Sequence, residues 1–230
     1  MSQEPLSADE FGGVVRLFPL PNLVLFPHVG QPLHVFEPRY RQLMADALDD
    51  DRLIAMALLR PGWEQEYHNG PPIHDTVCVG KIRQEESLPD GRYNLLLQGV
   101  CRARVVEEID ADKLYRLARV ELCPDEPVAS PTEEESLRDR LGRGVLPFFS
   151  AHPPAMEQLR GLIASPIALG SLCDIFSFAL PLETEDKQRL LAECDTGRRV
   201  RLLLDLLDGK TPPAGQEPPR RRYPPEFSPN

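Results

Sequence analysis

The sequence predicts an α+β fold, with a β-rich part that contains one early helix and a helical part that follows it. Residues 13–125 consist of short apolar runs separated by turn residues, a pattern typical of strands. Residues 126–211 instead place apolar residues at helical spacing. A single helix among this many strands is too few for an alternating α/β fold. We therefore expect the strands, which are joined as hairpins, to form an antiparallel barrel or curled sheet.

The most apolar segment near the N-terminus, LFPLPNLVLFPHVGQPLHVFEPRYR (residues 17–41), contains five prolines. Proline has no amide hydrogen for a sheet ladder, so each proline is expected at a strand end, in a turn or at a helix start. Short strands are predicted at residues 14–18, 23–26 and 33–36. Pro38 then opens a helix, since proline is tolerated at the first helical position. The apolar side chains of this helix recur at helical spacing and are Tyr40, Leu43, Met44 and Ala47.

The remaining strands are predicted from continuous or alternating apolar runs. Residues 52–59 have the pattern of a buried strand, and the polar segment RPGWEQEYHNGPPIHD (residues 60–75) that of a long loop. Loops longer than about 12 residues without structure of their own are uncommon and often functional. Two hairpins are expected after the loop, one turning at Asp90-Gly91 and the other at residues 109–112. Their strands are residues 76–84, 92–99, 101–108 and 113–123.

The helical part follows a linker that ends in helix-start signals. Ser130 or Thr132 can cap the first helix, and acidic residues occupy its first turn. Three helices are expected, the third opened by Ser165-Pro166. A short helix at residues 185–193 and a last one at residues 197–207 follow them.

The two ends of the chain are polar and are expected to lie outside the folded parts. Residues 1–12 are predicted to be a flexible N-terminus, and the proline-rich residues 212–230 a disordered or polyproline-like tail. The N-terminus lacks the apolar core of a secretory signal, and no apolar run approaches the roughly 18 residues that span a bilayer. Five scattered cysteines without a CxxC pair indicate neither a disulfide framework nor a zinc cage. We therefore expect a cytoplasmic protein that has no membrane partner.

The charge of the chain opposes nucleic-acid binding. The net charge is −10, and neither the β-rich part nor the helical part has an excess of basic residues. Binding to a phosphate backbone needs clustered lysine and arginine side chains. We expect no nucleic-acid partner.

Catalytic and cofactor motifs are weak or missing. The Gly-Lys-Thr at residues 209–211 lacks the glycine that a phosphate loop needs five positions earlier, and no GxSxG sequence occurs. Cys78 follows His68 and His74, but a cysteine inside TVCVG is more simply a small buried hydrophobe. The spacing of Glu66 and these two histidines matches no recognised metal site. We expect no catalytic residue, no cofactor and no bound metal.

The loop at residues 60–75 provides the candidate partner-binding surface. Large aromatic side chains with one polar end suit contact surfaces, and the loop carries Trp63 and Tyr67 beside charged and histidine residues. The alternative is that Trp63 folds back and plugs one end of the barrel. The candidate residues are Trp63, Glu66, Tyr67, His68 and His74.

Three segments, taken in order, resemble one known family. The run VRLFPLPNLVLFPHVGQPLHVFEPRYR, with Phe18-Pro19-Leu20 and then Leu25-Phe26-Pro27, is similar to the opening of the Lon protease N-terminal domain, the Lon substrate-binding domain. VGKIRQEESLPDGRYNLLLQGVCRARV resembles the glycine-containing strand, the Asp-Gly hairpin and the G…RARV strand of that family. LCDIFSFALPLETEDKQRLLAECDTGRRVRLLLDLL is similar to its helical segment. The resemblance covers about residues 14–208.

The resemblance implies a PUA-like β pseudobarrel followed by a helical bundle. It also implies a free-standing bacterial relative, since the sequence has neither a phosphate loop nor the serine–lysine signature of the Lon protease domain. We therefore expect a non-catalytic module that binds polypeptide substrates or a protein partner, linked to proteolysis or protein quality control. Self-association is a property associated with the family. The alternatives are a small hydrolase that uses residues 60–78 and an RNA-binding PUA-like module.

Overall fold

A computed structural model describes residues 11–65, 70–150 and 153–209, and the described residues form two compact units. Unit 1 comprises residues 11–123 and unit 2 comprises residues 124–209. Within these described residues, no helix combines the length and the apolar character that crossing a membrane requires. The candidate partner-binding residues Glu66, Tyr67 and His68 lie outside the described residues.

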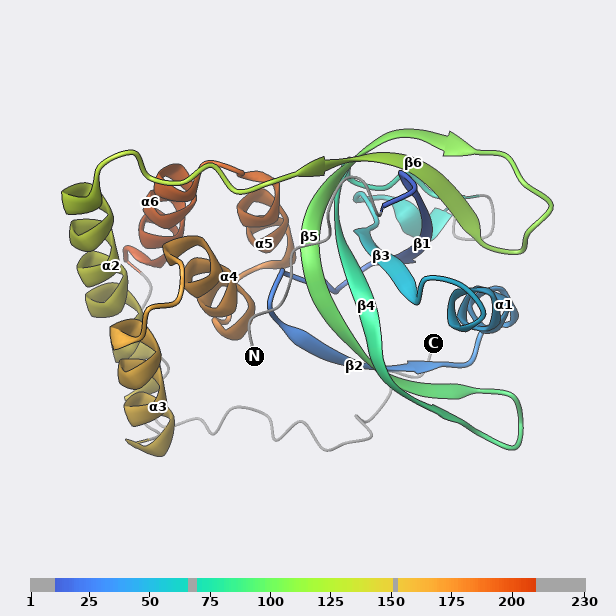
Figure 1. Ribbon diagram of the computed structural model, residues 1–230, viewed down its shortest axis with the longest axis horizontal. Helices are drawn as coiled ribbons and strands as arrows, with labels where there is room; N and C mark the ends of the chain where they lie inside the picture. The colour runs from blue at the N-terminus through green and yellow to red at the C-terminus, as the bar shows by residue number, and fades with distance from the viewer. Residues whose placement is uncertain (1–10, 66–69, 151–152, 210–230) are drawn as a thin grey trace. The chain divides into compact units, whose positions relative to one another are not determined.

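Unit 1 contains a six-stranded sheet and the helix α1, Pro38–Leu48 (Figure 1). The strand order is β2-β5-β4-β3-β1-β6, and β5 also pairs with β6. This second pairing closes β5, β4, β3, β1 and β6 into a ring, while β2 pairs with β5 outside it. The strands are β1 Val14–Leu20, β2 Gly30–Val35, β3 Leu53–Leu58, β4 Thr76–Ser87, β5 Tyr93–Ile109 and β6 Arg116–Cys123.

The sheet is mixed. The prediction of an antiparallel barrel or curled sheet was therefore wrong for one pair of strands, β1 and β3. β1 and β3 run parallel, with Leu17 opposite Ala55 and Leu20 opposite Leu58. Parallel neighbours need a crossover of a dozen or more residues. Residues 21–52, which contain β2 and α1, provide it. All six residues of β3 are buried, as expected for a strand inside the ring.

β5 is one continuous strand, so the prediction of separate strands at residues 92–99 and 101–108 was wrong. Gly99 lies inside β5, where its lack of a side chain permits another segment to pass close by. A Cβ atom at Gly99 would lie 2.0 Å from the carbonyl oxygen of Phe26. The segment at residues 23–26, predicted to be a strand, is irregular, and its residues Val24, Leu25 and Phe26 are buried.

The two predicted hairpins are confirmed as β4–β5 and β5–β6. The second has a longer turn than predicted, because β6 begins at Arg116 and not at residue 113. One core cluster fills the interior between the strands. Its apolar residues are Val15, Leu17, Leu53, Ala55, Ala57, Leu59, Ile73, Val77, Val79, Ala103, Ala118 and Val120.

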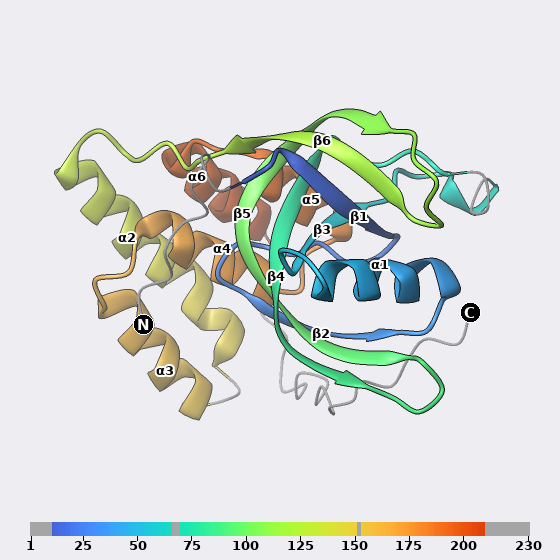
Figure 2. The same ribbon diagram turned by 45° about the vertical axis from the view of Figure 1, so that its right-hand side comes forward.

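The helix α1 forms as predicted, with Pro38 at its first turn. Figures 1 and 2 show it at one side of unit 1, between β2 and the β5–β6 hairpin. Tyr40 anchors the helix to β1, since its hydroxyl donates to the Pro19 carbonyl over 3.0 Å and its ring meets Phe18 edge-to-face at 4.2 Å. Its buried side chains are the four predicted ones: Tyr40, Leu43, Met44 and Ala47.

The regular elements named in the described part of unit 2 are all helices. Its first helix is capped as expected, because the Ser130 side chain accepts a hydrogen bond from the amide of Glu133. Its third α-helix begins at Leu169 rather than at Ser165-Pro166, because the residues after this pair form a short non-helical connection. The elements are α2 Pro131–Val145, η2 Leu146–Phe149, α3 Pro153–Ala164, α4 Leu169–Ala179, α5 Thr184–Ala192 and α6 Thr196–Leu207.

A buried ionic centre holds unit 2 together. The guanidinium of Arg199 on α6 is fully buried and forms two hydrogen bonds with Asp125, of 3.0 and 2.5 Å. It also donates to the carbonyl of Glu193 over 2.7 Å and lies 3.3 Å from the buried carboxylate of Asp174 on α4. Burial alone would lower the pKa of Arg199, but the attraction of Asp174 and Asp125 outweighs it and raises the pKa. The Arg199 guanidinium therefore keeps its proton and its positive charge despite burial.

Candidate functional site: an apolar recess on unit 1

A shallow recess on unit 1 lies where several segments meet. These are the end of β1, the start of α1, the residue after β3, the end of the 60–75 loop and the turn before β6. Its volume is about 30 Å³, which holds about one water molecule or one methyl-sized group. Its apolar and aromatic lining consists of Pro19, Tyr40, Leu59, Pro71, Leu114 and Tyr115. A recess of this size and lining is suited to receive part of an apolar side chain.

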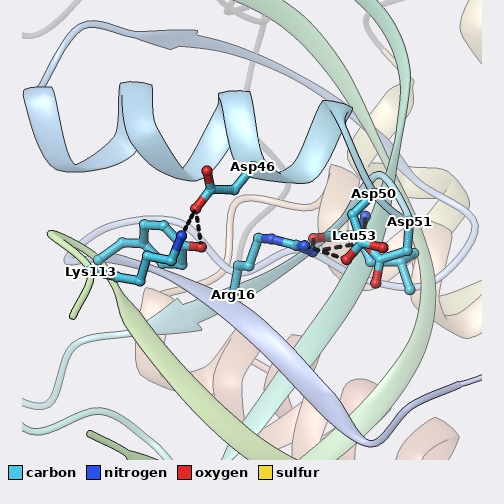
Figure 3. Close-up of polar contacts among 7 residues, drawn as sticks. Arg16, Asp46, Asp50, Asp51, Leu53 and Lys113 are labelled. Carbon is cyan, nitrogen blue, oxygen red and sulfur yellow. Dashed lines mark hydrogen bonds and ion pairs between the residues drawn. The ribbon is translucent and has the colours of Figure 1, made fainter. Parts of the chain in front are cut away.

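Leu114 stands out because it is a large apolar side chain at the rim that is 64% exposed. The turn that carries it is fixed to α1 by three hydrogen bonds. The Leu114 amide donates to the Gln42 side chain over 2.7 Å. The Lys113 ammonium and the Tyr115 hydroxyl both donate to Asp46, over 2.8 and 2.7 Å, and Figure 3 shows Lys113 directed at that carboxylate. The helix therefore holds the turn in one position and leaves the Leu114 side chain in solvent.

The hydrogen bonds between the turn and α1 shift the pKa values of Asp46 and Tyr115. The hydrogen bonds from Lys113 and then Tyr115 lower the pKa of Asp46 below its ordinary value. Burial, followed by the hydrogen bond to Asp46, raises the pKa of Tyr115 to about 12. At neutral pH the carboxylate is charged and the phenol keeps its proton, which is the combination that the hydrogen bond requires.

The turn that follows α1 is fixed by a second set of contacts, on the right of Figure 3. Arg16 of β1 forms ion pairs with Asp50 at 2.5 Å and with Asp51 at 2.7 Å. Burial by itself would lower the pKa of Arg16. The hydrogen bonds and charges of the two carboxylates raise this pKa by a larger amount, so the net shift is upward. The middle of α1 is thus tied to the turn before β6, and the residues after α1 are tied to β1, so the frame around the recess has little freedom to move.

The two arginines at the recess are neutralised inside the unit. Arg39 donates to Glu37 over 3.0 Å and its guanidinium lies 4.6 Å from the centre of the Tyr40 ring. Arg116 donates to Glu108 over 2.7 Å and to the carbonyl of Pro71 over 2.8 Å. Since each cation faces its own carboxylate, the rim carries no net charge from these pairs. An uncharged apolar group fits this rim better than a charged one.

The ends of the 60–75 loop are joined by backbone and side-chain bonds. Leu59 and Ile73 form an isolated antiparallel bridge, and the Arg60 amide donates to the carbonyl of Pro72 over 2.8 Å. The Arg60 side chain donates to Ile73 over 2.7 Å and pairs with Asp75 at 2.7 Å. The base of the loop is therefore a fixed part of unit 1 beside the recess.

The structure places two of the five predicted partner-binding residues. Trp63 lies in the 3₁₀ turn η1, Trp63–Gln65, is partly buried, and packs against the core cluster of unit 1. This packing agrees with the interpretation that Trp63 plugs one end of the strand ring. His74 is half-buried at the base of the loop, where its amide donates to the carbonyl of Leu58 over 2.9 Å. Neither residue lines the recess.

The candidate catalytic thiol is inaccessible. Cys78 is fully buried on β4, and its Sγ lies 3.7 Å from the carbonyl oxygen of Val79. A nucleophilic cysteine needs access and an electropositive environment. In the part of the chain that the structure describes, no group of three or more histidine, cysteine, aspartate or glutamate side chains is arranged to hold a metal ion.

Sequence reasoning missed the importance of Leu114. The strand predicted at residues 113–123 included Leu114, whereas β6 begins at Arg116. The missed signal is the polar run Asp110–Lys113 directly before Leu114, which makes the turn longer and leaves one leucine outside the ladder. The position in which the turn holds Leu114 depends on the bond from its amide to Gln42, which is distant in sequence, so this position follows from no local pattern.

Comparison with known families gives the class of the chain. Residues 14–209 match the family described as the ATP-dependent protease La (LON) substrate-binding domain, and the chain belongs to this family. Among curated proteins, it is 29% identical over 208 residues to Lon protease 2 of Myxococcus xanthus and 26% identical over 206 residues to Lon protease of Escherichia coli (strain K12). These alignments cover 89% and 85% of this chain. The chain spans only about a quarter of the length of these relatives, 24% and 25%.

Solved structures agree with this assignment. A Lon N-terminal domain protein from Xanthomonas campestris superposes with a TM-score of 0.61 at 25% identity, covering 84% of this chain and 97% of that one. The N-terminal domain of Mycobacterium avium complex Lon protease gives a TM-score of 0.67 at 16% identity, covering 85% and 98%, and shows the shared fold alone. The fold described above is therefore that of a Lon N-terminal domain.

Residues in the segments that resemble the Lon N-terminal domain make contacts that stabilise the fold. Phe18 and Pro19 hold α1 through Tyr40, as described above. In unit 2, Asp195 caps α6 by accepting from the amide of Arg198 over 2.8 Å, and Arg199 occupies the ionic centre. The recess residue Leu114 lies outside these segments.

Proposed function

We propose that the chain is a non-catalytic polypeptide-binding module linked to proteolysis, and that the recess with Leu114 is its contact surface. The support for binding is membership of a family described as a substrate-binding domain. The support for the surface is one observation, the exposed Leu114 side chain held beside an apolar recess by bonds to Gln42 and Asp46. The ligand that suits an apolar recess with a neutralised rim is an uncharged apolar stretch of an unfolded polypeptide.

The 60–75 loop is proposed as the flank of this surface. Gly70 and Pro71 of the loop line the recess, so a polypeptide that lies in the recess would run toward the loop. The loop residues proposed to contact it are those predicted from the sequence: Trp63, Glu66, Tyr67, His68 and His74. Since Trp63 packs against the core cluster, replacing it would also loosen unit 1. Tyr67→Ala is therefore the better test of the loop.

Binding can be measured with a fluorescently labelled model polypeptide that is kept unfolded by reduction and alkylation. The expected result is that the protein raises the anisotropy of the unfolded polypeptide and not that of its folded form. Leu114→Ser should weaken binding about tenfold, because burying an exposed leucine contributes roughly 1.5 kcal/mol. The matched control is Val106→Ser, which removes an apolar side chain that is 52% exposed on β5 and does not line the recess. Equal affinities of the two variants would reject the recess as the contact surface, and no binding by the wild type would reject the function.

The same proposal includes the type of barrel formed by the strands and the arrangement of the helices that follow them. The closed ring of strand pairings supports a PUA-like pseudobarrel at residues 13–125. Contacts among α2, α4 and α6 support a helical bundle at residues 126–211. Limited proteolysis would test these boundaries, with early cleavage expected only within residues 1–12 and 212–230 and in the linker after residue 123. A cytoplasmic location and a capacity for self-association complete the proposal.

No observation favours the alternative functions. A hydrolase that uses Cys78 would need an accessible thiol, and this one is buried on β4. An RNA-binding module would need clustered cations, and the net charge of the chain is −10.

A further inference from the structure

β2 is the edge strand of the sheet in unit 1. Among the described residues it stands at one end of the strand order and pairs only with β5. An edge strand presents a row of backbone donors and acceptors to which another extended chain can pair. β2 is therefore one place where unit 1 is open to pairing with a second copy of itself.

The middle of β2 is occupied by Pro32. In an antiparallel pair, alternate residues direct their backbone groups to the partner strand. Gly99 donates to the Val29 carbonyl over 2.9 Å, so Val29 faces β5, and the register continues this alternation along β2. The residues that also face β5 are Gln31, Leu33 and Val35. The residues whose backbone groups face the outer edge are Gly30, Pro32 and His34.

Pro32 leaves the centre of this edge without a donor, because proline has no amide hydrogen. The carbonyl oxygen of Pro32 accepts a hydrogen bond from the side-chain amide of Gln31 over 2.7 Å. This bond occupies one of the two acceptor positions of that carbonyl. An approaching strand therefore finds no amide hydrogen at residue 32 and a carbonyl oxygen with one of its two acceptor positions already occupied.

We propose that Pro32 and Gln31 form an edge guard, which prevents β2 from pairing with β2 of a second copy of this chain. Two copies related by a twofold axis would place their β2 strands antiparallel, with residue 32 of each copy opposite its counterpart. Gly30 of one copy would then face His34 of the other. The central pair of hydrogen bonds in this arrangement needs an amide hydrogen at residue 32 of both copies, which proline withholds. This inference concerns a different surface from the recess and does not depend on the proposed function.

The test restores the missing donor. Pro32→Thr and Pro32→Ala both return an amide hydrogen to the outer edge and remove no bond of the β2–β5 ladder, so circular dichroism should match that of the wild type. Sedimentation velocity should then show concentration-dependent association that raises the weight-average mass of both variants about twofold over the wild type. Hydrogen exchange followed by NMR should show that the new amide at residue 32 becomes protected as protein concentration rises.

Two further variants decide whether the edge is responsible. Pro32→Thr/His34→Pro moves the proline to the other outward position near the centre and should return the mass to that of the wild type. Pro89→Thr changes an exposed proline in the β4–β5 turn and should leave the mass unchanged. The proposal is overturned if neither Pro32 variant associates, if the double variant still associates, or if Pro89→Thr associates as strongly as Pro32→Thr.

Discussion

Replacing Arg199 by leucine should destabilise unit 2 strongly. The substitution removes a fully buried guanidinium that bonds to Asp125 and to the Glu193 carbonyl. It leaves the carboxylate of Asp174, which is 0% exposed, without this cation. Breaking a buried ion pair by removing one partner costs about 3–5 kcal/mol, because the remaining charge stays in a medium that solvates it poorly. We expect a loss in this range.

The losses of stability caused by replacing Arg199 and Asp174 separately should not add up in the double variant. In Arg199→Leu/Asp174→Leu the buried carboxylate is also gone, and replacing a whole buried pair by apolar residues is often nearly neutral. Asp125 keeps about a third of its side chain exposed, so it can be solvated when the guanidinium is absent. The double variant should therefore recover most of the stability that the single variant loses, which is the opposite of what two independent contacts would give.

Urea unfolding followed by circular dichroism at 222 nm measures this effect, because unit 2 is helical and unit 1 has one α-helix among its described residues. With an m value of about 2 kcal/mol per molar urea, the midpoint of Arg199→Leu should fall by about 2 M. Trp63 is the only tryptophan of the chain and lies in unit 1, so its fluorescence serves as an internal reference. The matched control is Arg198→Leu, whose side chain is 73% exposed on the same helix.

Two results would refute this reasoning. One is a change below about 1 kcal/mol for Arg199→Leu, comparable to the effect expected at an exposed site such as Arg198. The other is a double variant that is as unstable as the sum of its single substitutions. Either result would mean that the buried charges are solvated or compensated in a way that the contacts of Arg199 do not show.

Two further predictions concern unit 1 and use Trp63 fluorescence to follow urea unfolding. The raised pKa of Tyr115, about 12 against an ordinary 10.0, means that the folded state holds the phenolic proton more tightly than the unfolded state. Its contribution to stability is therefore complete below pH 10 and is lost as the pH rises from about 10 to 12. Wild type should lose more stability in this window than Tyr115→Phe, and parallel curves would contradict the raised pKa that burial and the bond to Asp46 together produce. Gly99→Ala should cost about 1–3 kcal/mol or more, since its Cβ would meet a backbone carbonyl 2.0 Å away, whereas Gly12→Ala has open space and should be close to neutral; similar values for the two would contradict the crossing at Gly99.

Elements with a local cause could be predicted from the sequence. The start of α1 follows from Pro38, and its buried face follows from the spacing of its apolar residues. The β4–β5 turn follows from Asp90-Gly91, where Gly91 has a φ of 78°. The cap at Ser130 is of the same kind. Each of these depends on the conformational preference of a few consecutive residues.

The candidate site could not be predicted in the same way. The loop at residues 60–75 was recognised from its polarity and length, and its end does line the recess. The exposed Leu114 was not recognised, because its position is fixed by Gln42, a residue 72 positions away. Trp63 was given two interpretations from the sequence, and only the packing against the core cluster favours one of them.

The sequence by itself determined the two-part organisation into strands and helices, the individual helices, the hairpins and the family. These features are set by the positions of turn residues, by the spacing of apolar side chains and by family motifs that occur in the same order along the chain. The tertiary structure alone decided that β1 runs parallel to β3, that β5 continues through Gly99, and that Arg199 is buried. These features depend on contacts between segments far apart along the chain. Because each contact needs both segments, neither segment taken alone has a sequence pattern that predicts it.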